Sequence, residues 1–113
     1  MGANNFETEE QGQTVNEAFL RARDHATYMY GHGGYTGTIA EKSEWLVIDL
    51  PEGVSIDEAI RFIYCVEYNE KAVPEAHRRW ARRWADRVLD KWGPCGAIKS
   101  GDNQWTFFGF ASS

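Results

Sequence analysis

The sequence predicts a single α+β domain over residues 1–113. Two helix-start motifs, TVNE and SIDE, open segments whose apolar residues recur every three or four positions. A third such segment is rich in Arg and Trp, and two β-type segments flank a turn near the C-terminus. With 113 residues, 42% of them hydrophobic, the chain has the size and composition of one domain with one packed core.

The first half of the chain predicts a strand, a helix and two more strands. Residues 4–10 (NNFETEE) predict an edge strand or an ordered arm, and TVNE begins a helix that ends near Gly31. The segments TGTIA (36–40) and EWLVIDL (44–50) predict two strands joined by a turn at EKSE.

The second half predicts two helices and a hairpin. SIDE begins a helix that we expect to reach Asn69, and a third helix runs from Pro74 to Trp92 before Gly93 stops it. Its buried face is predicted to carry Trp80, Trp84, Val88 and Trp92. Segments 95–100 and 104–112 form the hairpin, so the order is β-α-β-β-α-α-β-β. Short turns favour an antiparallel sheet with the helices packed on one face.

The last strand, WTFFGF, has apolar residues on both of its faces. Trp105, Phe107 and Gly109 alternate with Thr106, Phe108 and Phe110. This pattern predicts either a central strand covered on both sides or a strand with one face at a protein interface, which makes a homodimer a possible partner arrangement.

Charge and composition exclude several classes of function. Residues 1–70 hold 13 acidic and 4 basic residues, whereas residues 71–113 hold 4 acidic and 8 basic ones. The acidic total makes nucleic acid a less favoured partner, because phosphate contacts dominate such binding. We expect no secretory signal, no membrane span and a cytoplasmic location. Cys65 and Cys95 are expected to be reduced thiols, one of them buried in a helix.

The third predicted helix carries a candidate site for a partner protein or for phosphate. Its arginines repeat at four-residue spacing beside a Trp face: Arg78, Arg79, Arg82, Arg83 and Arg87. Arg clusters make bidentate contacts with phosphate, and Trp stacks on bases. The same arginines fit pairing with the acidic first half of the chain or a solvent-exposed face, so both uses stay open.

The segment YGHGGYTGTIAEK contains the candidate ligand-binding loop: His32, Gly33, Gly34, Tyr35, Thr36 and Thr38. Its glycine spacing matches neither a P-loop nor a dinucleotide fingerprint. Backbone amides and the Thr hydroxyls form a possible anion nest there, whereas the structural alternative is a helix stop followed by a turn.

Catalysis, metal and cofactors have little support in the sequence. His25, His32 and His77 are scattered, and no Ser or Cys nucleophile stands in a recognisable setting beside them. The chain shows no cluster of metal ligands, so we expect no metal and no cofactor, and an enzyme is the least favoured class of function.

The segments YGHGGYTGTIAEK and KWGPCGAIK and the ending WTFFGFASS resemble small uncharacterised proteins encoded by bacteriophages and some bacteria. The resemblance covers the glycine-rich loop and the C-terminal hairpin best and the middle helices least. It carries no assigned activity. It implies a phage-type accessory protein of the bacterial cytoplasm, acting by binding a host protein or a small signalling molecule.

The favoured function is therefore binding of a host or phage protein. The alternative is a binder, or sponge, of an anionic small molecule such as a nucleotide, with the glycine-rich loop and the arginine helix as opposing walls. An enzyme that uses His32 as a general base is the third hypothesis.

Overall fold

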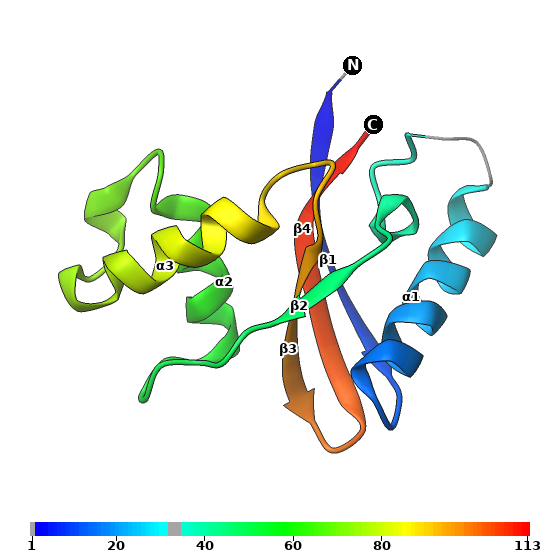
Figure 1. Cartoon of the computed structure of the whole chain (residues 1–113), viewed down its shortest axis with the longest axis horizontal. Helices are drawn as coiled ribbons and strands as arrows, with labels where there is room; N and C mark the ends of the chain where they lie inside the picture. The colour runs from blue at the N-terminus through cyan, green and yellow to red at the C-terminus, as the bar shows by residue number, and fades with distance from the viewer. Residues whose placement is uncertain (1, 32–34) are drawn as a thin grey trace.

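The computed structural model describes residues 2–31 and 35–113, and it confirms an α+β fold (Figure 1). In chain order the elements are β1 (Ala3–Gln11), α1 (Val15–Tyr30), the 3₁₀ helix η1 (Ile39–Glu41), β2 (Trp45–Val47), α2 (Ile56–Cys65), the 3₁₀ helix η2 (Glu70–Ala72), α3 (Glu75–Val88), β3 (Cys95–Gly101) and β4 (Gln104–Ser112). No helix in the described ranges is long and apolar enough to cross a lipid bilayer.

The sheet is mixed, so the predicted antiparallel sheet is partly wrong. The four strands lie in the order β1-β4-β3-β2. β4 pairs antiparallel with β1 and with β3, as the predicted hairpin requires, but β2 pairs parallel with β3. The connection from β2 to β3 contains α2 and α3, and a long helical crossover of this kind returns the chain in the same direction.

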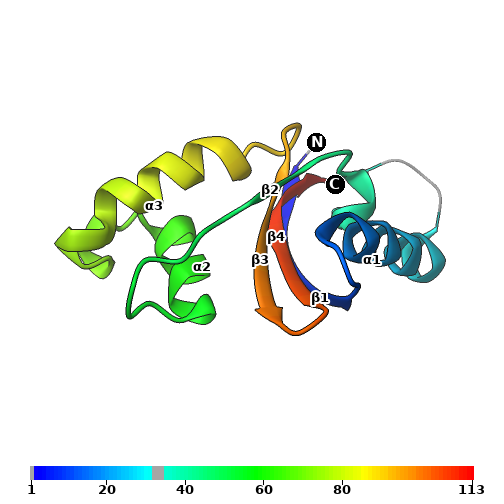
Figure 2. The same cartoon turned by 60° about the horizontal axis from the view of Figure 1, so that its bottom comes forward.

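Helices cover both faces of the sheet, which corrects the prediction that all of them pack on one face. α1 lies on one side, and α2 and α3 lie on the other (Figure 2). The reason is β4, which lies between two neighbours and places Phe107 in the α1 core and Phe108 in the core under α2 and α3. Both rings are fully buried, so the first alternative for WTFFGF, a central strand covered on both sides, is confirmed.

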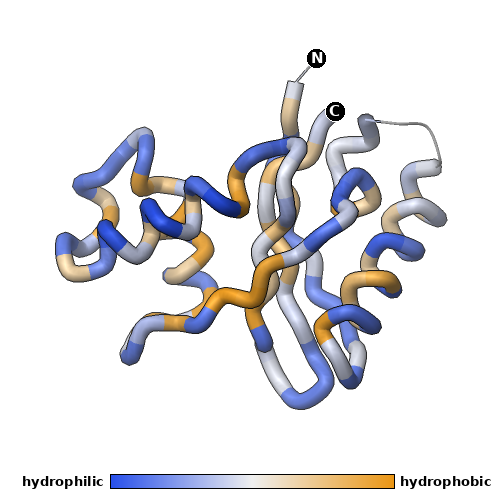
Figure 3. Tube along the Cα trace, in the orientation of Figure 1, coloured by the Kyte–Doolittle hydropathy of each residue, from blue (hydrophilic) through white to orange (hydrophobic). Residues whose placement is uncertain are grey.

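The segment TGTIA is not a strand. The Thr38 hydroxyl accepts a hydrogen bond from Ala40 N at 3.2 Å and starts η1 instead. The segment 44–50 is a strand only over β2, where the tube is apolar along most of its length (Figure 3). One further backbone bond, from Ile48 N to Ala97 O at 2.9 Å, extends its pairing with β3.

The helix starts agree with the sequence better than the helix ends do. Ser55 and Glu58 form the complete capping box of α2. Thr14 accepts from Glu17 N at 3.1 Å at the start of α1, but the Glu17 carboxylate pairs with Arg21 rather than reaching back. α2 ends at Cys65, four residues before the predicted end.

α3 also ends early, at Val88, so Trp92 lies outside the helix and is 63% exposed. This corrects its predicted place on the buried face. Trp80 and Trp84 do pack against the core, and Val88 is fully buried. The chain turns after Val88, and carbonyl groups of the segment beyond the helix bind a lysine from another part of the fold.

That lysine is Lys42, which is 2% exposed. Its Nζ donates hydrogen bonds to Asp90 O at 3.0 Å, Lys91 O at 3.3 Å and Gly93 O at 2.9 Å. Three acceptors satisfy all three protons of an ammonium group. Burial nevertheless lowers the pKa of Lys42. The contact joins the segment after η1 to the connection between α3 and β3.

Neither cysteine forms a disulfide, as predicted. The buried one is Cys95 in strand β3, not the helical Cys65, which is partly exposed. Cys95 packs in the core under α1. Burial raises the pKa of Cys95 to about 12, so its thiol is neutral at physiological pH.

We predict that Lys42→Met destabilises the fold by about 2–5 kcal/mol, because it removes the buried ammonium group that donates three hydrogen bonds to carbonyl groups after α3. Urea unfolding followed by tryptophan fluorescence measures the change. Lys99→Met is the matched control, since Lys99 is exposed on β3 and should change the free energy of unfolding by less than about 0.5 kcal/mol. Equal stability of the two variants would contradict this role for Lys42.

Candidate functional site

The predicted ligand-binding loop is described only in part. His32, Gly33 and Gly34 lie outside the described residues. Tyr35 has a left-handed φ of 66°, and its ring meets Trp92 edge-on with the centroids 6.1 Å apart. The aromatic side chain of the loop therefore packs against the segment that follows α3.

The hydroxyl groups of the loop bind a carboxylate of the same chain. Thr36 donates to Glu41 Oε2 from its backbone N at 3.0 Å and from its Oγ1 at 2.8 Å. Thr38 Oγ1 lies 2.8 Å from Thr36 Oγ1. Burial alone would raise the pKa of Glu41, but hydrogen bonds from Thr36 and Tyr35 and the charge of Arg23 bring that pKa below its ordinary value. These donors form an anion site that Glu41 occupies.

The predicted arginine face is partly used inside the fold. Arg78 Nε donates to the carbonyl groups of Glu70 and Val73, at 3.1 and 2.9 Å, and Arg82 pairs with the Glu70 carboxylate. These contacts hold η2 against α3. Among the other predicted arginines, Arg87 lies over the Trp84 ring, whereas Arg79 and Arg83 are exposed and form no ion pair with any described residue.

The two predicted walls of an anion site do not face each other. Thr36 and Thr38 precede η1, which packs with α1 on one side of the sheet. Arg79 and Arg83 lie on α3, which packs on the other side of the sheet (Figures 1 and 2). Trp92, in the segment beyond α3, contacts Tyr35 of the loop.

The described histidines serve structural contacts. His25 is exposed, not at the border of the core, and its Nδ1 lies 2.6 Å from Glu10 Oε1 on β1. His77 stacks on the Phe62 ring. Over residues 2–31 and 35–113, no three His, Cys, Asp or Glu side chains are grouped closely enough to hold a metal ion.

The structure adds a feature that the sequence analysis did not identify as a site, the outer edge of β1. Gly12 N donates to Asn103 O, and Ser113 N donates to Gly2 O. In an antiparallel pair the bonded positions alternate, so the even-numbered residues of β1 direct their backbone groups toward β4. The backbone groups of the odd-numbered residues therefore point away from the sheet.

Four of these odd-numbered residues keep their outward backbone groups open. The fifth, Gln11, is closed off: its N–H donates to Glu10 Oε2, and its carbonyl accepts from Arg21. The rest form no backbone hydrogen bond on their outer side with any described residue: Ala3, Asn5, Glu7 and Glu9. We call these four residues the open edge. A row of unpaired N–H and C=O groups is the template on which another strand pairs.

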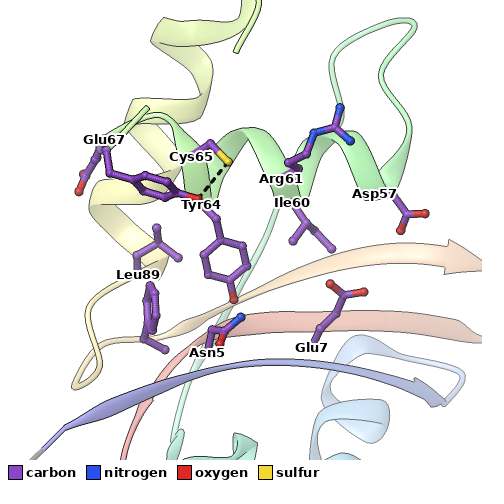
Figure 4. A pocket seen from close by; sticks show the side chains of 11 residues that line it. Asn5, Glu7, Asp57, Ile60, Arg61, Tyr64, Cys65, Glu67 and Leu89 are labelled. Carbon is purple, nitrogen blue, oxygen red and sulfur yellow. Dashed lines mark hydrogen bonds between the residues drawn. The ribbon is translucent and has the colours of Figure 1, made fainter. Parts of the chain in front are cut away.

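A cavity of about 770 Å³ lies beside the open edge on the side of α2 (Figure 4). Ile60, Tyr64, Leu89 and Phe110 form its apolar part, and a second cavity of about 410 Å³ continues it past Glu9. The two cavities together are the α2 groove. The Tyr64 hydroxyl donates to Gly109 O at 2.9 Å, which fixes the side chain as part of the groove wall. Burial raises the pKa of Tyr64, so its hydroxyl is neutral at physiological pH.

A third cavity, of about 370 Å³, lies on the other side of β1. Phe6 and Thr8 of the strand face Ala22, Ala26 and Met29 of α1 across it. We call this cavity the α1 groove. β1 therefore has an open backbone edge with a groove above and a groove below.

The sequence held part of the signal for this site. Residues 4–10 predicted an edge strand or an ordered arm, and the structure confirms an edge strand, β1. Its face alternation is also visible in the letters NNFETEE, with Phe6 as the apolar residue. The grooves had no such signal, because each needs a helix to extend over the strand from another part of the chain.

We predict that Glu41→Gln lowers stability by about 1 kcal/mol at pH 7, since a charged acceptor of the Thr36 donors becomes neutral. A carboxyl whose folded pKa is depressed contributes stability above its unfolded value of 4.5, and that contribution is lost as the pH falls through the folded pKa. Urea unfolding at pH 7 and pH 3 should therefore show a difference from the wild type that closes at pH 3. Glu44→Gln, an exposed neighbour, is the control, and a difference that persists at pH 3 would contradict the role of the charge.

Comparisons of the chain with models of protein families, with curated proteins and with solved structures gave no match. The candidate site therefore stands on its own geometry: an open strand edge with a groove on each side.

Proposed function

We propose that this chain is a binding module that takes an extended segment of a partner protein as an added strand along the outer edge of β1. The observation that carries the proposal is the open edge, four residues whose backbone N–H and C=O groups point away from the sheet. An added strand satisfies these groups, and main-chain hydrogen bonds of this kind supply affinity in strand-addition complexes.

The two grooves supply selectivity for side chains, which the backbone edge alone lacks. Side chains of an extended segment alternate between the two faces of a sheet. A segment on β1 therefore directs one set of side chains into the α2 groove and the alternate set into the α1 groove. The grooves lie on opposite faces of the same strand, as this alternation requires.

The resemblance to phage-encoded proteins makes a host or phage protein the proposed partner, met in the bacterial cytoplasm. The anionic small-molecule alternative has one observation in its favour, the exposed guanidinium groups of Arg79 and Arg83. It is the weaker candidate, because the Thr36 donors already bind Glu41 and the arginines lie across the sheet from them.

Amide hydrogen exchange tests strand addition directly. In the free protein we expect fast exchange at Asn5, Glu7 and Glu9 and slow exchange at Phe6 and Thr8, which bond to β4. A panel of extended peptides, each as long as the nine-residue β1, should slow the first three amides on the order of tenfold or more for those that bind. Peptides that bind and leave these amides unchanged would overturn the proposal.

Asn5→Pro provides the matching variant. It removes an outward N–H and leaves the bonds to β4 in place, which an edge strand tolerates. Loss of one hydrogen bond should weaken peptide binding about tenfold, with the melting temperature within a few degrees of the wild type. Asn5→Ala controls for the side chain and should bind within about twofold of the wild type. Wild-type affinity in Asn5→Pro would contradict pairing at this edge.

A further inference from the structure

We infer that the segment added to β1 is basic on one face and apolar on the other, with Lys or Arg at every second position in the α2 groove and small apolar residues in the α1 groove. The inference rests on the strand addition proposed above. It assigns a chemical class to the partner, which the open edge alone does not.

The α2 groove is acidic. Its lining includes a single basic side chain, Arg61. It also includes four carboxylates: Glu7, Glu9, Asp57 and Glu67. None of the four carboxylates forms an ion pair with a described residue. Arg61 lies over the Phe62 ring at 5.6 Å. Unpaired carboxylates around a groove attract cationic side chains and raise the rate of their association.

The shape of the α2 groove also fits a long basic side chain. Ile60, Tyr64 and Phe110 supply apolar lining. Glu7 of β1 and Asp57 of α2 lie beside this apolar part (Figure 4). A Lys or Arg stem covers apolar surface while its charged end stays at the polar margin. Ser100 lines the same groove, and its buried Oγ has no hydrogen-bond partner in the described structure.

The α1 groove, in contrast, has a largely apolar lining. Ala22, Ala26 and Met29 line it from α1, and Phe6 lines it from β1. Glu7 also lines part of this cavity, and Glu10 on the neighbouring part of β1 already pairs with His25, which lines it too. Small apolar side chains therefore fit here, because burial of apolar surface is the interaction this groove offers.

The same charges disfavour a second copy of this chain as the occupant. In antiparallel self-pairing, the fully overlapping register sets Glu7 against Glu7 of the second copy, and a two-residue shift toward the C-terminus sets Glu7 against Glu9. Like charges directly opposite each other destabilise a strand pair. Glutamates on an exposed edge thus block self-association and leave the edge open to a basic strand.

The test uses three peptides of the length of β1, nine residues, with capped termini. They alternate Lys with Val, Gln with Val and Glu with Val, and isothermal titration measures their binding to the full chain. We expect the Lys peptide to bind at least about tenfold tighter than the Gln peptide and the Glu peptide to bind weakest. Raising the salt to 0.5 M should remove most of this preference, because exposed charges are then screened.

The double variant Glu7→Gln with Glu9→Gln should bring the Lys peptide to within about threefold of the Gln peptide. Glu44→Gln with Glu52→Gln removes the same charge from exposed positions elsewhere and should retain the wild-type preference. Loss of the preference in this control pair would show that net charge, and not the groove, selects the peptide.

The outcomes separate the two proposals. Equal binding of all three peptides, with slowed exchange at Asn5, Glu7 and Glu9, would overturn the basic preference and leave strand addition standing. Binding of the Lys peptide with unchanged exchange at these amides would overturn strand addition and, with it, this inference. Failure of every peptide to bind would overturn both.

Discussion

The ammonium group of Lys42 is the interaction on which the arrangement of the two halves depends. It is buried, and three carbonyl groups after α3 accept its three protons. These carbonyls lie beyond the end of α3 at Val88, where the chain turns into β3. The lysine thereby ties the segment beside α1 to the connection from α3. A buried charge with complete hydrogen bonding holds such a joint in one geometry, since any other leaves the charge unsatisfied.

The need to cover both faces of the central strand β4 explains why β1 is left as an open edge. With Phe107 in one core and Phe108 in the other, β4 needs a helical layer on each face. The crossover through α2 and α3 supplies one layer and returns β3 beside β2, while α1 supplies the other. β1 is left at the end of the sheet with helices above and below it and no strand beyond it. The grooves on either side of β1 are a consequence of covering β4.

Local sequence signals were sufficient wherever a structure depends on neighbouring residues. The capping box at Ser55 and Glu58, the C-terminal hairpin and the edge strand at residues 4–10 all formed as predicted. Other predictions failed for local or for distant reasons. Thr38 caps a 3₁₀ helix in place of the predicted strand. α3 ends at Val88, and the segment beyond it, which contains Trp92, is bound through its carbonyl groups to the distant Lys42. The two threonines of the glycine-rich loop are explained by Glu41, five residues beyond Thr36, as a partner within the loop itself.

The sequence by itself determined the α+β class, the helix starts and the two apolar faces of the last strand, because each follows from periodicity and side-chain type over a few residues. Only the tertiary structure decided that β2 pairs parallel with β3, that helices cover both faces, and that the acids of β1 and α2 meet around one groove. These features depend on which distant segments pack together. The free energy that favours one packing over another is a sum over the whole core, so no single stretch of the chain determines it.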